Sequence, residues 1–441
     1  MRTEIRSGLL TLGLAPSLKQ TAVLCWALLF VFLVLPLAVA MHHQAPAALD
    51  ADFVNFYTLG RILNEYPHSQ LYDYNLQRSI AEQVHPLKEG EYSPVAYPPA
   101  VAIAFQPFAA LPYWTAYKTW LPITISLYGS AMVLLGRSLF PGRSALQSLL
   151  LCFSLAFFPF VIETLVNGQL SAVGFFALSM AIREDRRQRP LACGMWLAVC
   201  LYKVTLLIWI LPMLLVTRRW RALAGFSAGA AVFLALTTAI AGVQAWNGYL
   251  SGLLRFRAGP LRYLGSSTDA RFGFPFWKYV DITAFTSLLT KGPPWVPLAI
   301  FAVAAIVTAA TLGKRWWQNR NPELVWATAI SATLVVNLYM PIYDATLAVI
   351  GIMLTISGVW WKATHSARRW LLILLLAIFV VSWESVPLAM ATRVQFMTLL
   401  FTGLWILQYK ALGVRYGAIS GIPAASSRHH DSNKDDARMA K

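Results

Sequence analysis

Charged residues are scarce in this chain of 441 residues, at 12% of the total, and acidic ones are scarcest, with 19 Asp and Glu against 36 Lys and Arg. A soluble protein carries about 25% charged residues, so the composition argues against soluble or disordered domains. Only four cysteines occur, all inside apolar stretches, which excludes a disulfide scaffold and a zinc site built on paired cysteines. A hydrophobic content of 58% and a mean hydropathy of +0.57 indicate an all-α polytopic membrane protein.

The surplus of basic residues, a formal net charge of +17, is concentrated beside the apolar segments. Cytoplasmic loops carry an excess of Lys and Arg, so these clusters orient the chain. They are Arg2/Arg6/Lys19, Arg137/Arg143, Arg183/Arg186/Arg187/Arg189, Arg218/Arg219/Arg221, Lys314/Arg315/Arg320, Lys362/Arg368/Arg369 and the tail from Lys410. One orientation accommodates all of them, with both termini cytoplasmic and 21–40 as an uncleaved signal anchor. The charge therefore fixes orientation and does not indicate a nucleic-acid partner.

Two long loops are external in this orientation, over 41–97 and 244–294. The first carries seven carboxylates, and the second is rich in Arg, Gly and Trp. We expect a single integral membrane domain over 1–420 and a disordered cytoplasmic tail over 421–441.

The apolar pattern predicts about 10–13 transmembrane or re-entrant helices, together with external interfacial helices. Helical patterns in the first external loop fall around 52–64 and 75–85. Segment 98–111 is too short to span and is expected to re-enter or lie along the membrane. The last two pairs of spans are expected to meet outside at 341–344 and near Glu384.

Two further segments begin and end at cytoplasmic clusters. Segment 144–183 has Glu163 and the triplet 167–169 near its middle, which predicts two short helices with these polar residues at the outer face. Segment 190–217 is too short for two spans and has Lys203 at its centre. It predicts a re-entrant pair of half-helices that meet around Lys203.

Ionisable residues inside apolar segments are candidate functional residues, because a charge in hydrocarbon costs at least about 2.5–3.5 kcal/mol on insertion scales. They could instead cap helix ends at the interface, a structural role that suits Glu384 best. The predicted topology places all of them toward the external side with other polar residues. The set comprises Lys203, Glu163, Asp344 and Glu384, with Asn167, Gln169 and Tyr343 beside them.

An external carboxylate and a buried lysine beneath it could perform two different steps of a transfer reaction. The carboxylate can deprotonate an attacking hydroxyl, and the cation can stabilise a phosphate leaving group. Tyr97-Pro98-Pro99 stands where the first loop meets the membrane, and its stiff backbone directs Tyr97 toward whatever the loop covers. No spacing of His, Cys and carboxylates indicates a metal site, and no Gly-rich loop indicates a cytoplasmic nucleotide sugar.

Several motifs, taken in order, resemble glycosyltransferase family 87. The run Asp52-Phe53-x-x-Phe56-Tyr57-x-x-Gly60-Arg61, followed by Leu71-Tyr72-Asp73, is similar to its first external loop. The later motifs are Tyr97-Pro98-Pro99, Pro107-x-x-x-Leu111-Pro112, Ala116, Trp120, Asn167-Gly168-Gln169, Lys203, Leu211-Pro212, Arg218-Arg219-Trp220-Arg221 and Pro341-x-Tyr343-Asp344. Each motif is weak alone, but their order and spacing over about 50–350 are fairly specific.

This resemblance implies a bundle of the GT-C fold that moves a hexose, mannose-like, from a polyprenyl-phosphate carrier with inversion. The acceptor is a lipid or glycan on the external face of a bacterial plasma membrane, whose lipids surround the protein. The family's catalytic base maps onto Asp52, with Asp50 as a competitor, and its characteristic Lys onto Lys203. Other expected donor or substrate contacts are Arg61, Tyr97, Asn167, Gln169, Tyr343 and Asp344, with Glu163 and Arg262 as secondary candidates.

The resemblance implies no organic cofactor, although some GT-C enzymes use a divalent cation. Departures from the family pattern are Val204-Thr205 after Lys203, where relatives often have a proline, an Arg-rich second loop and the lack of a histidine near Asp344. Two other membrane functions are alternatives, namely a lipid-linked sugar transporter or flippase and a protein like the O-antigen polymerases or ligases. The last alternative is a structural membrane protein that catalyses no reaction.

Overall fold

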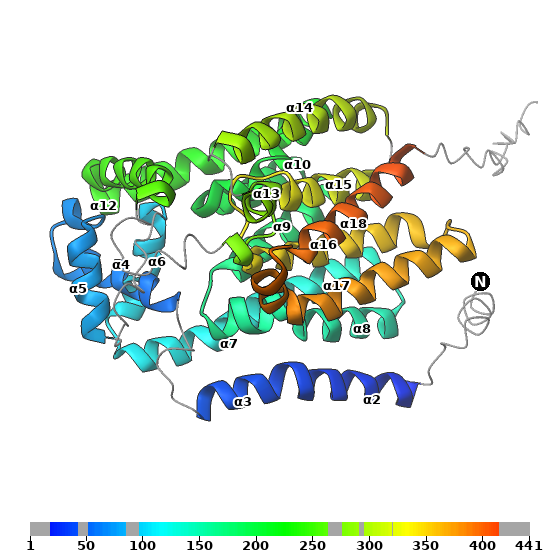
Figure 1. The fold of residues 1–441 in the computed structure, drawn as a ribbon. Coiled ribbons are helices and arrows are strands. Elements are labelled where there is room, and N and C mark those ends of the chain that lie inside the picture. The colour runs from blue at the N-terminus through cyan, green and yellow to red at the C-terminus, as the bar shows by residue number, and fades with distance from the viewer. Residues whose placement is uncertain are drawn as a thin grey trace, which may run out of the picture.

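Helices make up nearly all of the computed structural model (Figure 1). It describes residues 18–42, 52–84, 97–262, 276–290, 295–319 and 321–413. Within these ranges the β structure amounts to one isolated bridge, between Tyr279 and Pro341. The prediction of an all-α polytopic membrane protein is confirmed.

Six helices in the described ranges are long and apolar enough to cross a membrane, and a pair bent by 55° makes a seventh candidate. The pair is α8 (Ser144–Leu155) with the π-helix η3 (Pro159–Val166). The six are α7 (Tyr113–Leu139), α10 with η4 (Pro190–Leu207), residues 220–254 of α12 (Trp220–Arg262), α14 (Trp295–Gln318), η7 to η8 (Ile342–Trp360) and α17 (His365–Thr392). Full-length spans are fewer than the 10–13 predicted spanning or re-entrant helices, because several apolar segments form shorter helices.

The N-terminal apolar segment is one of these shorter helices. It consists of α2 (Leu18–Leu29), the π-helical turn η1 (Phe30–Val34) and α3 (Leu35–His42), and α2 packs against α8 (Figure 1). Its apolar part, Ala22–Ala38, lies within the predicted signal anchor at 21–40.

Four short helices form a group beside the bundle, which we call the α4–α6 group (Figure 1). They are α4 (Phe53–Glu65), η2 (His68–Gln70), α5 (Tyr74–Val84) and α6 (Pro99–Ala109). The helices α4 and α5 lie close to the predicted 52–64 and 75–85. A Cβ on Gly60 of α4 would lie 2.5 Å from the carbonyl oxygen of Phe105 in α6, so these two helices are in close backbone contact. The long helix α12 breaks at Gly242 and continues onto this group.

Segment 190–217 turns back at Lys203, as the sequence predicts. The helix α10 (Pro190–Val199) leads into the 3-10 helix η4 (Cys200–Leu207), where Lys203 has non-helical angles of φ −150° and ψ 86°. The chain returns through α11 (Ile210–Val216). Asp185 before the segment forms an ion pair with Arg219 after it, so both ends lie together.

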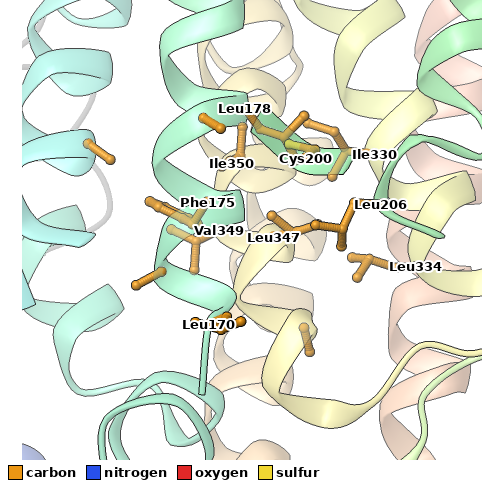
Figure 2. Packing of buried hydrophobic residues seen from close by; sticks show 14 of the residues in the cluster. Leu170, Phe175, Leu178, Cys200, Leu206, Ile330, Leu334, Leu347, Val349 and Ile350 are labelled. Atoms are coloured by element: carbon orange, nitrogen blue, oxygen red, sulfur yellow. The ribbon is translucent and has the colours of Figure 1, made fainter. Parts of the chain in front are cut away.

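The innermost part of the bundle is formed by α15 (Pro322–Val335), η7 (Ile342–Thr346), α16 (Leu347–Thr355) and η8 (Ile356–Trp360). The chain turns at Pro341 between α15 and η7, close to the predicted 341–344. Leu347, Val349 and Ile350 of α16 pack with side chains of α9 (Ser171–Arg186), η4 and α15 in a dry core (Figure 2). This core fixes the relative positions of the elements that carry the polar site.

The prediction of a turn near Glu384 is wrong. The helix α17 runs through this position to Thr392 and ends where Arg393 adopts a left-handed conformation (φ 60°), before α18 (Phe396–Gly413). Glu384 therefore lies within a helix and not at a turn between two spans.

The arginine-rich loops meet at one end of the bundle. Arg186 forms an ion pair with Glu323, and its guanidinium also donates to the carbonyl oxygen of Ser138 at 3.1 Å. Arg143 lies over the ring of Trp361 at 3.5 Å, and Arg218 lies over that of Trp317 at 4.2 Å. In the part of the chain that the structure describes, the clusters around Arg143, Arg186 and Arg218 therefore lie against segments of neighbouring loops predicted to be cytoplasmic.

Candidate active site

Asp52 is fixed by a turn between η3 and α9. The carbonyl oxygen of Asn167 accepts hydrogen bonds from the backbone N–H groups of Asp52 (3.2 Å) and Phe53 (3.1 Å). Gly168 follows with φ +74°, and a Cβ there would lie 2.6 Å from the Cβ of Phe53. A left-handed turn with no side chain is thus required for α4 to sit on it.

The same turn is held from behind by aromatic side chains of α7. The indole Nε1 of Trp120 donates to the carbonyl oxygen of Gly168 at 3.1 Å, and the hydroxyl of Tyr117 donates to that of Val166 at 2.6 Å. The amide of Asn167 donates to the buried carboxylate of Glu163 at 3.1 Å. The turn is consequently a rigid platform on which the position of Asp52 depends.

The carboxyl of Asp52 is available for chemistry. Asp52 occupies the N-cap position of α4, yet its side chain accepts no capping hydrogen bond and instead pairs with the amide of buried Gln169. Burial raises the pKa of this carboxyl, while the bond to Gln169 and the positive charges of Lys278 and Lys203 oppose the rise. The half-buried carboxyl therefore binds a proton more readily than a free aspartate does.

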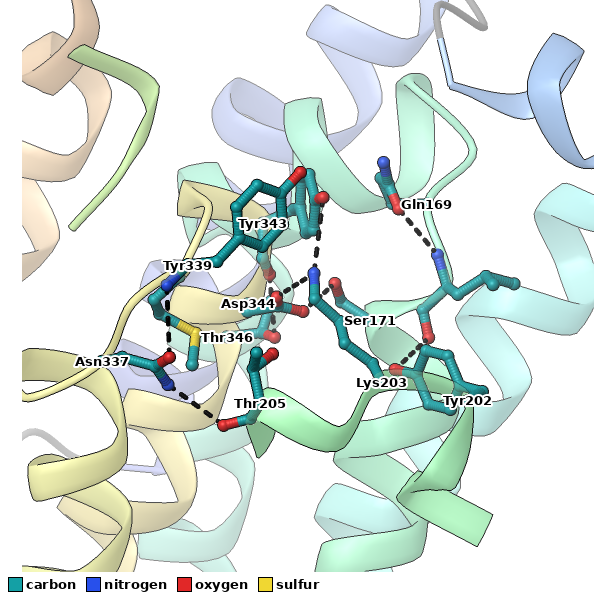
Figure 3. A network of polar contacts seen from close by, with 12 residues as sticks. Gln169, Ser171, Tyr202, Lys203, Thr205, Asn337, Tyr339, Tyr343, Asp344 and Thr346 are labelled. Carbon is teal, nitrogen blue, oxygen red and sulfur yellow. Dashed lines mark hydrogen bonds and ion pairs between the residues drawn. The ribbon is translucent and has the colours of Figure 1, made fainter. Parts of the chain in front are cut away.

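Lys203 lies in a buried ion pair at the centre of the bundle (Figure 3). Its Nζ is 2.5 Å from Oδ2 of Asp344, and the hydroxyl of Ser171 donates to Oδ1 of Asp344 at 2.8 Å. The Nζ also donates to the hydroxyl of Tyr343 at 3.4 Å. Lys203 is 8% exposed and Asp344 is 1% exposed, so water reaches the pair poorly. Three separate elements, α9, η4 and η7, bring these side chains together.

Five tyrosines surround this pair, and we call them the tyrosine cluster: Tyr97, Tyr202, Tyr279, Tyr339 and Tyr343. The ring of Tyr97 stacks on that of Tyr202, with centroids 6.5 Å apart, and its hydroxyl is hydrogen-bonded to Tyr343. Tyr339 is hydrogen-bonded to Tyr279 and Tyr343. Burial raises the pKa of Tyr97 and Tyr279 well above the usual value for tyrosine, so their hydroxyls stay protonated at neutral pH.

A short segment of the second long loop also reaches the site. It consists of η6 (Phe276–Lys278) and the residues leading into α13 (Ile282–Leu289). The carboxyl of Asp281 accepts from the backbone N–H groups of Ala284 and Met340, both at 2.9 Å. Burial raises the pKa of Asp281 to about 6, although these bonds oppose the rise. Asp281 therefore attaches this segment to the turn before η7.

The structure brings most of the predicted site residues together. Two groups result, one around Asp52 and one around Lys203, and the charge of Lys203 acts on Asp52. The members are Asp52, Tyr97, Glu163, Asn167, Gln169, Lys203, Tyr343 and Asp344. No local pattern marks Ser171, Tyr339 or Lys278 in the sequence, because the residues near which they lie are distant along the chain.

Three predicted residues are not brought into these groups. Arg61 lies more than two turns further along α4 and pairs with exposed Glu65 at 3.0 Å. Arg262 lies at the end of α12, where only the backbone is described, and Asp50 lies outside the described residues. Within the described ranges, no group of three His, Cys, Asp or Glu residues could hold a metal ion.

The family model of glycosyltransferase family 87 matches residues 96–341, which is more than half of the chain. The chain belongs to this family. The predicted resemblance is thereby confirmed, and the protein is a membrane glycosyltransferase. No curated protein and no solved structure matches the chain significantly.

The family match covers the scaffold of the site more fully than its charged residues. Tyr97, the 167–169 turn and Lys203 fall inside it, whereas Asp52 precedes it and Asp344 follows it. Membership of family 87 therefore rests on the bundle and the turn, and the roles of the two carboxylates rest on their geometry.

Proposed function

We propose that this member of family 87 transfers a hexose, mannose-like, from a polyprenyl-phosphate carrier to a lipid or glycan acceptor on the external face of a bacterial plasma membrane. One observation carries the proposal. The half-buried carboxyl of Asp52 shares one polar site with the Lys203–Asp344 pair, in a bundle whose arginine-rich loops gather elsewhere. A base thus lies in a polar site that also carries the positive charges of Lys203 and Lys278, and transfer from a sugar phosphate requires both a base and positive charge.

In the proposed reaction Asp52 acts as general base. Its carboxylate takes the proton from an acceptor hydroxyl as that oxygen attacks C1 of the hexose. The bond between C1 and the phosphate oxygen breaks, its electrons pass to that oxygen, and polyprenyl phosphate leaves. This single displacement inverts the configuration at C1. The bond from Gln169 orients the carboxylate, and the raised pKa of Asp52 makes it a stronger base than a free aspartate.

The other predicted contacts have roles that suit a sugar phosphate. Positive charge at the site would stabilise the negative charge that develops on the leaving phosphate, a role that the sequence predicts for Lys203. The protonated hydroxyls of the tyrosine cluster can donate to and accept from sugar hydroxyls, and their rings provide a flat apolar surface. Arg61 is a proposed contact for the acceptor side, since it lies further along α4 and is half-exposed.

The experiment compares two aspartates of the first long loop in the full-length protein. We expect Asp52→Asn to reduce transfer from polyprenyl-phosphate mannose by about 100-fold or more, because the base is lost while the shape is kept. Asp73→Asn is the matched control. The carboxyl of Asp73 only caps α5, accepting from the backbone N–H groups of Asn75 (2.9 Å) and Leu76 (3.1 Å), and an asparagine retains this ability.

Full transfer activity in Asp52→Asn would disprove the role of Asp52. Transport of the lipid-linked sugar across vesicle membranes with no transfer in the wild-type protein would favour the transporter alternative.

A further inference from the structure

The charge of Lys203 is already compensated within the protein. Its Nζ lies 2.5 Å from Oδ2 of Asp344, and both residues are almost fully buried. A phosphate that bound directly to Lys203 would have to compete with this carboxylate and displace it from a closed site. Breaking a buried pair is strongly unfavourable because the remaining charge is left without a partner. A phosphate-binding cation is therefore to be sought elsewhere in the site.

Lys278 is such a cation. It is exposed, at the end of η6, and its charge acts on both Asp52 and Glu163. In the ranges of 244–294 whose side chains are described, 244–254 and 276–290, it is the basic residue present. Among the described residues, no carboxylate forms an ion pair with Lys278, in contrast to Lys203. Its charge is thus free to bind an anion beside Asp52.

The backbone that carries Lys278 is held on both sides. The carbonyl oxygen of Trp277 accepts from the amide of Gln395 at 2.5 Å, and the backbone N–H of Val280 donates to the carbonyl oxygen of Met340 at 2.9 Å. Asp281 adds a second bond to Met340. A lysine on a fixed backbone loses less freedom when it binds an anion than one on a mobile loop.

The position of Lys278 relative to the rest of the site follows from its neighbour. The ring of Tyr279 lies 5.0 Å from that of Tyr339, and the ring of Tyr339 lies 5.4 Å from Nζ of Lys203. Lys278 therefore precedes, in the chain, a residue of the tyrosine cluster, and its own side chain is exposed.

We propose that Lys278 binds the phosphate of the lipid-linked donor, while Lys203, neutralised by Asp344, holds the tyrosine cluster in place. This inference rests on the proposed function and names the residue that touches the donor. The ammonium of Lys278 neutralises the phosphate in the bound donor and stabilises the extra charge when the C1–O bond breaks. Asp52 and Lys278 would then lie on the two sides of C1, the base toward the acceptor and the cation toward the leaving group.

A second role for Lys278 gives a different experimental result. The positive charge of Lys278 lowers the pKa of Asp52. In the alternative, this effect on the base is the whole function of Lys278, and the residue does not contact the phosphate. A tuning residue would shift the pH profile of transfer and leave the affinity for a phosphate unchanged. A phosphate-binding residue changes the affinity itself, and this can be measured without any sugar transfer.

The experiment measures binding of polyprenyl phosphate, which carries no sugar, to the full-length protein in nanodiscs of neutral lipid. Binding is followed by isothermal titration calorimetry, because the chain has 17 tryptophans and the fluorescence of Trp277 cannot be resolved from the others. We expect Lys278→Gln to weaken binding by about tenfold or more, because a charge-assisted contact is lost. Lys278→Arg keeps the charge and should retain most of the affinity. The control is Lys118→Gln, which removes another exposed lysine, on α7.

The outcomes separate this inference from the proposed function. Unchanged affinity in Lys278→Gln, with or without a shifted pH profile, would overturn the inference and leave the transferase proposal intact. Equal displacement by phosphatidylglycerol would also overturn it, since the site would then select anionic lipids in general. Lys278-dependent binding of polyprenyl phosphate, in a protein that transfers no sugar from polyprenyl-phosphate mannose, would support the site and refute the proposed reaction.

Discussion

The buried ion pair of Lys203 and Asp344 consists of two charged residues that can each be identified from the sequence, although their contact cannot be predicted from it. Lys203 and Asp344 each stand out as ionisable residues in apolar segments, and the sequence predicts both as functional candidates. Their mutual contact joins η4 to η7, segments far apart along the chain, and no local pattern encodes it. Lys278 does not differ from its sequence surroundings in this way, because basic residues are common in polar loops.

The buried pair leads to a prediction about stability. We expect Asp344→Asn to destabilise the protein by about 3–5 kcal/mol, because it leaves the ammonium of Lys203 buried without a counter-charge. The double variant Lys203→Met/Asp344→Asn removes both charges and should recover much of this loss. SDS-induced unfolding in mixed micelles measures the difference. If the double variant were less stable than Asp344→Asn, the pair would not be the cause.

The half-buried base leads to a prediction about pH. Asp52 must be ionised to accept a proton, so kcat/KM should fall as pH decreases through its pKa. Burial raises this pKa above the usual value of 3.8, so the acid limb should lie above pH 3.8. Lys278→Gln removes a positive charge that lowers the pKa and should move the limb to still higher pH. An acid limb that did not move in this variant would mean that another group titrates.

Among the secondary-structure elements, polar residues within apolar segments predicted two breaks correctly, whereas the ends of helices were predicted poorly. The sequence predicts the turn at 167–169 and the break at Lys203, since a polar group in hydrocarbon requires a local change of structure. The same reasoning failed at Glu384, because α17 continues through this position to Thr392. Helix lengths were not predicted either, since α15 has only 14 residues and α16 only 9.

The turn that carries Asp52 can be tested at Gly168. Gly168→Ala should reduce transfer strongly, because it combines a strained φ of +74° with a contact of 2.6 Å to Phe53 at the start of α4. Gly142→Ala is the control. It has a similar φ of +72°, which costs about 1–2 kcal/mol, but nothing lies within 4 Å of the new Cβ. Comparing kcat in the two variants separates displacement of Asp52 from loss of stability. Equal loss of kcat in both would show that strain alone is responsible.

At the scale of the whole molecule, the orientation in the membrane is a prediction from charge. The arginine-rich loops are neighbours in space, as one cytoplasmic surface requires, and the α4–α6 group would be external. The sequence could predict this arrangement because the distribution of Lys and Arg is read locally, loop by loop. It could not predict how the loops contact each other.

Single-cysteine variants test this orientation. The four native cysteines are buried, and replacing them gives a background that does not react. A membrane-impermeant maleimide should label Ser79→Cys, exposed on α5, in intact cells. It should label Gln318→Cys, exposed at the end of α14, only after the cells are permeabilised. The reverse pattern would mean that the chain is inserted the other way round.

The break in α12 couples the bilayer to the site mechanically. The candidate span over residues 220–254 includes this break, and beyond Gly242 the helix packs at Gly248 against Tyr72, which lies between η2 and α5. The hydroxyl of Tyr72 donates to the carbonyl oxygen of Tyr97 at 2.6 Å, and Tyr97 belongs to the tyrosine cluster. Transmembrane helices tilt to match the thickness of the bilayer. A change in the tilt of α12 would move Tyr72 and, through it, Tyr97 in the tyrosine cluster. We therefore expect the rate of transfer to depend on the thickness of the membrane.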